Sequence, residues 1–167
     1  VYAVEGTFDD CQRNVKQAFI DSELSSAHLT SANSINIGRL IPQSWYYVFA
    51  ALQAEKYLAS SALKMKQAKT SLVFSIPSGN FGHLTACLLA KLQGLPVKHV
   101  IAATNINDIV PHFLATGEFL PRPSLLTLAN SMDIGNPSNW ERIRYYLGDD
   151  HRKIGKLLHG VSKTDEE

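Results

Sequence analysis

Hydrophobic and polar residues alternate along the chain with two different periods, and their order predicts strands alternating with helices. A short apolar run over 72–76 has the length and the β-branched and aromatic content of a buried strand in a parallel sheet. Residues 78–82 predict a tight turn, because they include two glycines. The stretch 84–92 is apolar nearly all round, which predicts a buried helix that ends before Gly94. The central part of the chain is therefore predicted to be a strand, a glycine turn and a helix.

Three elements are expected before this central part. Residues 1–5 have the pattern of a strand. Thr7 and Asp10 have the spacing of a capping box and predict the start of a helix. A polar loop over 24–36 follows, and a second helix is expected to begin at Ile37. The side chains expected on the buried faces of these helices are Phe8, Cys11, Val15, Ala18 and Phe19 in the first and Ile41, Trp45, Val48, Phe49 and Leu52 in the second.

The C-terminal part is expected to continue the same alternation. A strand over 97–103 would lie parallel to the first strand through a right-handed crossover. The fold class is therefore α/β, with a partial open parallel sheet and flanking helices. The other expected elements are a helix over 109–116 closed by Gly117, a short strand over 125–128, a helix from Asn136-Pro137 interrupted at Gly148, and a last amphipathic helix with Ile154, Leu157, Leu158 and Val161 on one face.

The glycine turn has chemical potential, because the first backbone N–H groups of a helix have no partner within the helix and attract anions. Gly79 is expected to supply a positive φ, and Gly82 to leave room for a ligand. The turn has neither the lysine of a GxxxxGK[ST] loop nor the GxGxxG pattern of dinucleotide sites. The pattern is thus consistent with a phosphate that is held but not transferred, and equally with an ordinary tight turn.

Composition limits the possible partners. The chain has 16 basic and 15 acidic residues among 167, so it has no charge excess that would favour nucleic acid or an anionic membrane. No apolar run approaches the ~20 residues of a membrane span. Cys11 and Cys87 are not spaced as metal ligands, and we expect both to be buried thiols in a reducing, cytoplasmic setting.

The segment Pro77 to Gly82, PSGNFG, resembles the phosphate-binding loop of the threonine synthase family, whose members are pyridoxal-phosphate enzymes with the tryptophan synthase β-like fold. Four further blocks are similar to that family in order and spacing, so that the resemblance covers about residues 1–147. It implies a fragment of a two-domain, fold type II enzyme, with 1–30 in the smaller domain and 31–167 in the larger, cofactor-binding one. The four blocks are 4–12, 31–36, 102–108 and 132–139.

The resemblance also implies a reaction and a cofactor site. The whole enzyme would convert O-phospho-L-homoserine and water to L-threonine and phosphate with pyridoxal 5′-phosphate as cofactor. Ser34 and Asn36 would lie near the cofactor, although a turn that caps the helix at Ile37 explains them equally well. The residues expected to hold the cofactor phosphate are Ser78 through its hydroxyl and Gly79, Asn80, Phe81 and Gly82 mainly through backbone N–H groups.

The catalytic lysine of that family is not found in this sequence, because no lysine here lies in the serine- and phenylalanine-containing motif that should precede it. We therefore expect the chain to be an internal piece of a longer enzyme that cannot turn over by itself, and that self-associates through its exposed cleft face. Two alternatives stay open. One is a related pyridoxal-phosphate dehydratase, against which the 132–139 block argues, and the other is a non-catalytic phosphate- or nucleotide-binding α/β module.

Overall fold

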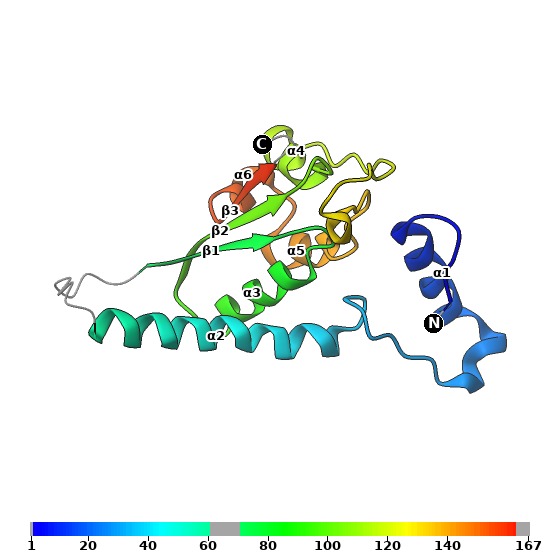
Figure 1. Cartoon of the computed structure of the whole chain (residues 1–167), viewed down its shortest axis with the longest axis horizontal. Helices are drawn as coiled ribbons and strands as arrows, with labels where there is room; N and C mark the ends of the chain where they lie inside the picture. The colour runs from blue at the N-terminus through cyan, green and yellow to red at the C-terminus, as the bar shows by residue number, and fades with distance from the viewer. Residues whose placement is uncertain (1, 61–70, 163–167) are drawn as a thin grey trace.

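The computed structural model describes residues 2–60 and 71–162, and its centre is a three-stranded parallel sheet. The strands are β1 (Leu72–Pro77), β2 (Val97–Thr104) and β3 (Leu158–Ser162), in the order β1-β2-β3 (Figure 1). The expected strands over 72–76 and 97–103, their parallel pairing and the α/β class are confirmed.

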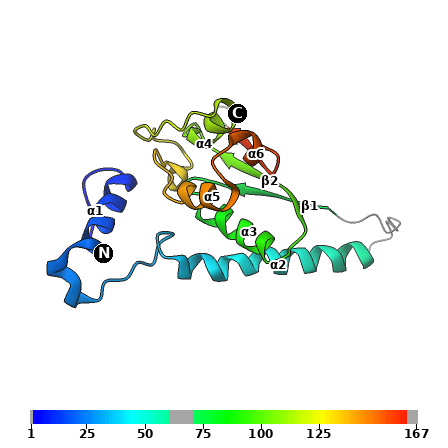
Figure 2. The same cartoon turned by 180° about the vertical axis from the view of Figure 1, so that it is seen from behind.

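Helices flank this sheet. Helix α3 lies between the sheet and the long helix α2, as both views of the molecule show (Figures 1 and 2). No helix in the described part of the chain is long and apolar enough to cross a membrane. The helical elements are α1 (Phe8–Ile20), the 3-10 turn η1 (Ser22–Ala27), α2 (Ile37–Ser60), α3 (Gly82–Leu92), α4 (Ile109–Thr116), the 3-10 turn η2 (Asn130–Met132), α5 (Trp140–Leu147) and α6 (His151–Gly155).

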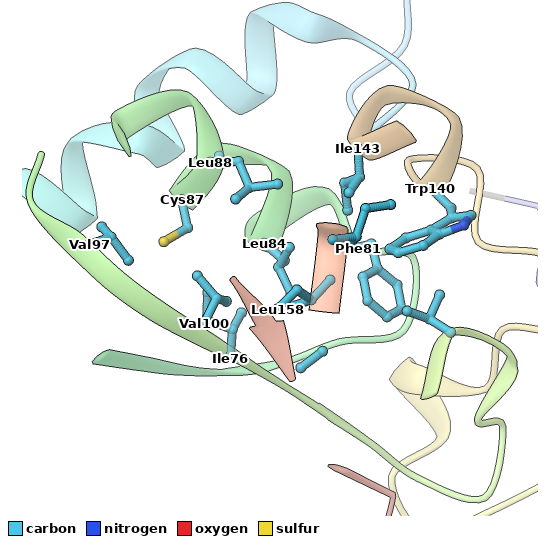
Figure 3. Packing of buried hydrophobic residues seen from close by; sticks show 14 of the residues in the cluster. Ile76, Phe81, Leu84, Cys87, Leu88, Val97, Val100, Trp140, Ile143 and Leu158 are labelled. Atoms are coloured by element: carbon cyan, nitrogen blue, oxygen red, sulfur yellow. The ribbon is translucent and has the colours of Figure 1, made fainter. Parts of the chain in front are cut away.

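The hydrophobic core lies where α3 covers β1 and β2. Leu84 and Leu88 of α3 pack toward Val100 of β2 and Leu158 of β3 (Figure 3). Trp140 and Ile143 of α5 extend this core beyond the start of α3. Burial of each such side chain contributes about 1.5–3 kcal/mol, so the strand, turn and helix at 72–92 are held by the best-packed part of the molecule.

The N-terminal region differs from the sequence prediction in two ways. The expected strand over 1–5 is wrong, because residues 2–5 belong to no strand. Helix α1 begins at Phe8 with the expected capping box of Thr7 and Asp10, and Gln12 is its one buried residue. On its expected buried face Phe8 and Phe19 are exposed, and Cys11, expected to be a buried thiol, is only partly buried. The periodicity identified the helix correctly, whereas the side that is covered depends on distant contacts with residue 135 and its neighbours.

Helix α2 begins at Ile37 as expected, but the predicted buried face is wrong. Its buried residues are Leu40, Ser44, Tyr47 and Ala51. Trp45 and Phe49 are 62% and 64% exposed, whereas Tyr47 is buried and its hydroxyl donates to the His83 carbonyl of α3. The small side chains of Ser44 and Ala51 allow the two helices to pack closely, which local periodicity alone does not reveal.

The C-terminal third also contains corrections. The expected strand over 125–128 is not formed, and the helix expected from Asn136 begins at Trp140. The expected last helix is wrong beyond Gly155, because the chain then forms β3. The register of β3, in which Leu158 is opposite Val100, gives these residues backbone hydrogen bonds that a helix pattern in the sequence cannot anticipate.

One face of the sheet is open among the described residues. Val73 of β1 is 51% exposed, and His159 and Val161 of β3 are exposed on the same face. The outer edges of β1 and β3 pair with no other described strand. Parallel sheets are usually covered on both faces, so this sheet is only half covered in the described part of the chain.

The capping box of α1 predicts a pH dependence. The backbone and side chain of Thr7, followed by the side chain of Arg13, lower the pKa of Asp10 to about 2. A carboxyl with a depressed pKa stabilises the folded form above its unfolded pKa near 4, and this stabilisation is lost as the pH falls toward 2. We therefore expect α1 to lose helicity over that range, as amide chemical shifts of residues 8–20 would show. The variant Asp10→Asn should show no such step, and an unchanged step in that variant would contradict the assignment.

Candidate functional site

The loop between β1 and α3 leaves a series of backbone amides without partners. Among the described residues, no hydrogen-bond acceptor contacts the backbone N–H of residues 79–84. The amide of Ser78 is bonded to the Ala103 carbonyl (2.8 Å), and that of Thr85 to the Phe81 carbonyl (2.9 Å), so the free series is bounded on both sides. Six consecutive unpaired donors at the start of an 11-residue helix form an anion-binding arrangement.

Phe81, and not Gly79 as expected, has the left-handed backbone of this loop. Its φ is 59°, whereas Gly79 does not have a positive φ. The Phe81 ring makes an edge contact with Trp140 at 5.7 Å and is 4% exposed. A buried ring therefore holds a non-glycine residue in a conformation that costs of order 1 kcal/mol or more.

The two glycines of the loop are required by close packing against other segments. A Cβ on Gly79 would lie 2.8 Å from the Met132 Cα. A Cβ on Gly82 would lie 2.7 Å from the Ser34 Cβ, so the space beside Gly82 is filled by Ser34 and not by a ligand as expected. Two segments distant in sequence thus approach the loop at its glycines.

A cavity of about 300 Å³ opens at this loop. Its walls combine the free amides with polar side chains, and among the described residues none of the lining residues is acidic. Arg39 is the one described lining residue with a full positive charge, and its guanidinium donates to the Ala32 carbonyl at 2.8 Å; a cation beside the cavity suits an anionic ligand. Residues lining this cavity include Phe8, Ser34, Arg39, Gly79, Asn80, Phe81, Gly82, His83 and Met132.

The Asn80 side chain ties the loop to two other segments. Its Nδ2 donates to the Ser34 Oγ at 2.7 Å. Its Oδ1 accepts from both the backbone N–H and the hydroxyl of Ser138, at 2.7 and 3.0 Å. The Asn139 Nδ2 donates to the Asn80 carbonyl at 3.0 Å. Asn80 is therefore held through its side chain and its carbonyl, and its N–H stays free.

Arg142 reinforces the same junction from α5. Its guanidinium donates to the carbonyls of Ser34 and Ile35 and to the Asn139 side chain. Asn139 is fully buried, so this hydrogen bonding is screened from water. Neither Arg142 nor its role was predicted from the sequence, because the contact joins residues more than a hundred positions apart.

Two residues expected near the cofactor, Ser78 and Asn36, do not line this cavity. The Ser78 hydroxyl donates to the Ile76 carbonyl at 2.8 Å, and Ser78 does not line the cavity. The Asn36 side chain accepts from the Gly38 amide (2.9 Å) and donates to the Ser31 carbonyl (3.0 Å), which is the helix-capping turn considered as its alternative role. Ser34, Gly79, Asn80, Phe81 and Gly82 all line the cavity.

The loop after β2 is bonded to the segment that carries Met132, one of the residues lining the cavity. Asn105 and Asn107 are buried, and both donate to the Asp133 carboxylate, at 2.7 and 3.3 Å. Asp133 also accepts from the amide and hydroxyl of Thr127. This network holds the segment that places Met132 against Gly79, so the two asparagines have a structural role here.

Burial alters the titration of two groups near the loop. Desolvation lowers the pKa of His83, which favours the neutral imidazole near pH 7. Burial raises the pKa of the Cys87 thiol to about 12, and this buried cysteine is therefore a poor nucleophile. Among the described residues, no group of three or more metal-ligating side chains is assembled.

Comparison with known proteins gives one consistent result. No protein-family model matches the chain. The threonine synthase of Serratia marcescens is 53% identical over 98% of this chain and 36% of its own length, and that of Escherichia coli K12 is 48% identical over 99% and 36%. The chain thus spans about 36% of the length of these curated relatives.

Solved structures agree with the sequence comparison. The crystal structure of threonine synthase from Escherichia coli matches with a TM-score of 0.82 and 48% identity, over 98% of this chain and 36% of that one. A pyridoxal-phosphate-bound threonine synthase from Brucella melitensis matches with a TM-score of 0.73 and 33% identity, over 97% of this chain and 38% of that one.

Proposed function

We propose that this chain holds the phosphate of pyridoxal phosphate in a threonine synthase, because it corresponds in sequence and fold to one part of those enzymes. The whole protein would convert O-phospho-L-homoserine and water to L-threonine and phosphate. The observation that carries this proposal is the series of free amides at 79–84, because residues 79–83 of this series line a cavity without acidic residues on its described walls. The cofactor-bound neighbour from Brucella melitensis supports the choice of ligand.

The residues present fit a phosphate group. A dianion bound by several preorganised N–H groups gains charge-assisted hydrogen bonds, each worth about 1.5–3 kcal/mol. Gly79 and Gly82 keep the backbone close to Met132 and Ser34, so the loop cannot easily open. Asn80 completes the arrangement, because its side-chain bonds leave its own amide unpaired. The loop is therefore rigid before the ligand arrives, which reduces the entropy lost on binding.

The chain's own residues would bind and orient, and they would not carry out proton transfer. Pyridoxal phosphate, when bound, supplies an electron-withdrawing ring that stabilises negative charge next to the substrate nitrogen. Among the described residues, no lysine or carboxylate lines the cavity at 78–82. We propose that Ser34 and Arg39 shape the polar wall beside the ligand, and that Ser78 and Asn36 support the loops from outside.

We propose that the isolated chain does not release phosphate from O-phospho-L-homoserine, and that a protein containing it together with the rest of a threonine synthase does so as a carbon-oxygen lyase. A phosphate-release assay on both proteins would check this. Turnover by the purified chain alone would contradict the proposed division of roles.

Cofactor binding by the chain itself gives a separate prediction. Titration with pyridoxal phosphate should shift the amide resonances of 79–84, whereas 5′-deoxypyridoxal, which lacks the phosphate, should leave them in place. Asn80→Ala should weaken binding about tenfold or more, because it releases the bonds to Ser34 and Ser138. Asn14→Ala is the matched control, since Asn14 is exposed on α1.

Two results would favour other functions. Equal shifts with 5′-deoxypyridoxal would show that the amides of 79–84 do not recognise the phosphate. Shifts with ADP but not with pyridoxal phosphate would favour the non-catalytic nucleotide-binding module, whose support is the same strand, turn and helix. The relatives described above are threonine synthases and not dehydratases, which favours the phosphate-eliminating reaction over the dehydratase.

Three further points stay predictions. We propose that 1–30 belongs to the smaller domain and 31–167 to the larger domain of the whole enzyme. A cytoplasmic location and self-association of the chain are proposed on the same basis. The exposed apolar side chains of α2, including Trp45 and Phe49, support self-association because they present an uncovered hydrophobic surface.

A further inference from the structure

A second cavity, of about 260 Å³, lies between α1 and the segment that leads into α5. It shares no lining residue with the cavity at the loop 78–82, although Ser138 on its wall is bonded to Asn80 of that loop. On one side α1 contributes Gln12, Arg13 and Lys16, of which Lys16 lies four positions after Gln12 and three after Arg13, on the same helix face as each of them. Ser138 and Glu141 lie on the opposite side.

Gln12 is the feature that points to a ligand. Gln12 is one of the residues that line the cavity, and it is only 5% exposed. No described residue accepts a hydrogen bond from its Nε2 atom. A buried donor without a partner is costly, so proteins usually pair such groups or leave them for a ligand. An acceptor that enters this cavity would satisfy the Gln12 amide.

The charges on the walls define the kind of acceptor. The Asp9 carboxylate already accepts from the Gly135 amide at 3.0 Å, and Arg13 is paired with Asp10 at 2.6 Å. Lys16 and Glu141 have no ion pair among the described residues, with each other or elsewhere. Lys16 therefore offers a positive charge and Glu141 a negative charge that do not neutralise each other directly, and Asp9 adds a second carboxylate, which is already bonded to the Gly135 amide.

We propose that this cavity binds a small α-amino acid. The carboxylate of the ligand accepts from Gln12 Nε2 and from the Lys16 ammonium group, and the ligand's ammonium group donates to the Glu141 carboxylate. A zwitterion is favoured over a simple anion because the walls carry both charges. The proposal does not depend on the proposed enzymatic function, since neither the cofactor nor the loop at 78–82 takes part.

The test uses L-serine as the probe and the whole 167-residue chain. The side-chain amide resonance of Gln12 should shift and saturate, whereas that of Gln17, which is exposed on the same helix, should stay in place. Acetate and methylammonium each carry one of the two charges and should bind at least about tenfold more weakly. The cofactor titration follows different resonances, so failure of one experiment is distinguishable from failure of the other.

Variants of the cavity residues test the contacts of the ligand's carboxylate and of its ammonium group separately. Gln12→Glu should weaken L-serine binding about tenfold or more, because it replaces a donor by a negative charge, and Gln17→Glu should not change it. Glu141→Gln should weaken L-serine but not acetate. If Gln12→Glu does not fold, Lys16→Ala can replace it, because Lys16 is exposed. This variant should also weaken L-serine binding, since it removes the cation that contacts the ligand carboxylate. Absence of any shift at Gln12, or equal affinity for acetate and L-serine, would overturn the proposal.

Discussion

Replacing Trp140 by alanine is expected to lower the free energy of unfolding by about 3–5 kcal/mol, a large part of the stability of a domain of this size. Trp140 is fully buried and contacts the rings of Phe81, Phe113 and Phe119 at centroid distances of 5.7, 5.4 and 6.3 Å. The indole N–H makes no hydrogen bond to a described residue, so the loss is one of packing. Chemical denaturation followed by circular dichroism would measure it.

The same substitution should also weaken binding at the loop. Phe81 loses the ring that supports its left-handed backbone, and the free amides on either side of it become less ordered. Trp45→Ala is the matched control, because Trp45 is 62% exposed and its removal should change stability by no more than about 0.5 kcal/mol. Equal denaturation midpoints for the two variants would show that the core around Trp140 is not packed as described.

Gly135→Ala is expected to lower the free energy of unfolding by about 3 kcal/mol, at the upper end of overpacking effects. A Cβ on Gly135 would lie 1.9 Å from the Arg122 carbonyl oxygen and 2.9 Å from the Ser124 nitrogen, so backbone must move. The Gly135 carbonyl accepts from the Arg122 amide, and its own amide donates to Asp9. The displacement would therefore separate both segments, and thermal unfolding would record the loss.

Gly155→Ala provides the comparison for this variant. A Cβ on Gly155 meets no described atom within 4 Å, and Gly155 lies in α6 without a positive φ. Its substitution should be neutral or should stabilise the protein by up to about 1 kcal/mol, because alanine restricts the unfolded chain. If Gly135→Ala were equally harmless, the close contact between 122 and 135 could not exist in solution.

Local signals were sufficient for the central part of the fold. The apolar run of β1, the small residues of the turn and the all-round apolar pattern of α3 are consecutive in sequence, and each is decided by neighbours within a few positions. The same holds for the Thr7 capping box and for Gly117, which ends α4 with a φ of 85°. Such elements depend on backbone preferences and short-range hydrogen bonds, which a single sequence expresses directly.

The site was only partly predictable for the same reason. The position of the loop and its free amides follow from the order of strand, turn and helix. The residues that hold it do not, since Asn80, Ser138 and Arg142 meet only after three distant segments have packed. Ser138 lies in the block 132–139, which resembles a block of the threonine synthase family, but nothing in the composition of that block indicates that it bonds to Asn80.

Long-range packing also explains the misassigned elements. The spacing of Ile154, Leu157, Leu158 and Val161 suits a helix, yet the free edge of β2 pairs with 158–162 and makes a strand. In α2 the apolar side chains of Trp45 and Phe49 face outward, whereas Leu40, Ser44, Tyr47 and Ala51 form the buried face. Both outcomes depend on a partner element, which periodicity cannot supply.

The half-covered sheet has a practical consequence for anyone handling this chain. Among the described residues the outer sides of β1 and β3 pair with no other strand, so their N–H and C=O groups can accept a strand from another molecule, and the open face beside them would be buried in the same step. Concentrated solutions would therefore tend toward edge-to-edge growth and precipitation. Lysine in place of Val73, at the border of that sheet, would oppose such growth by placing charge where two molecules would meet.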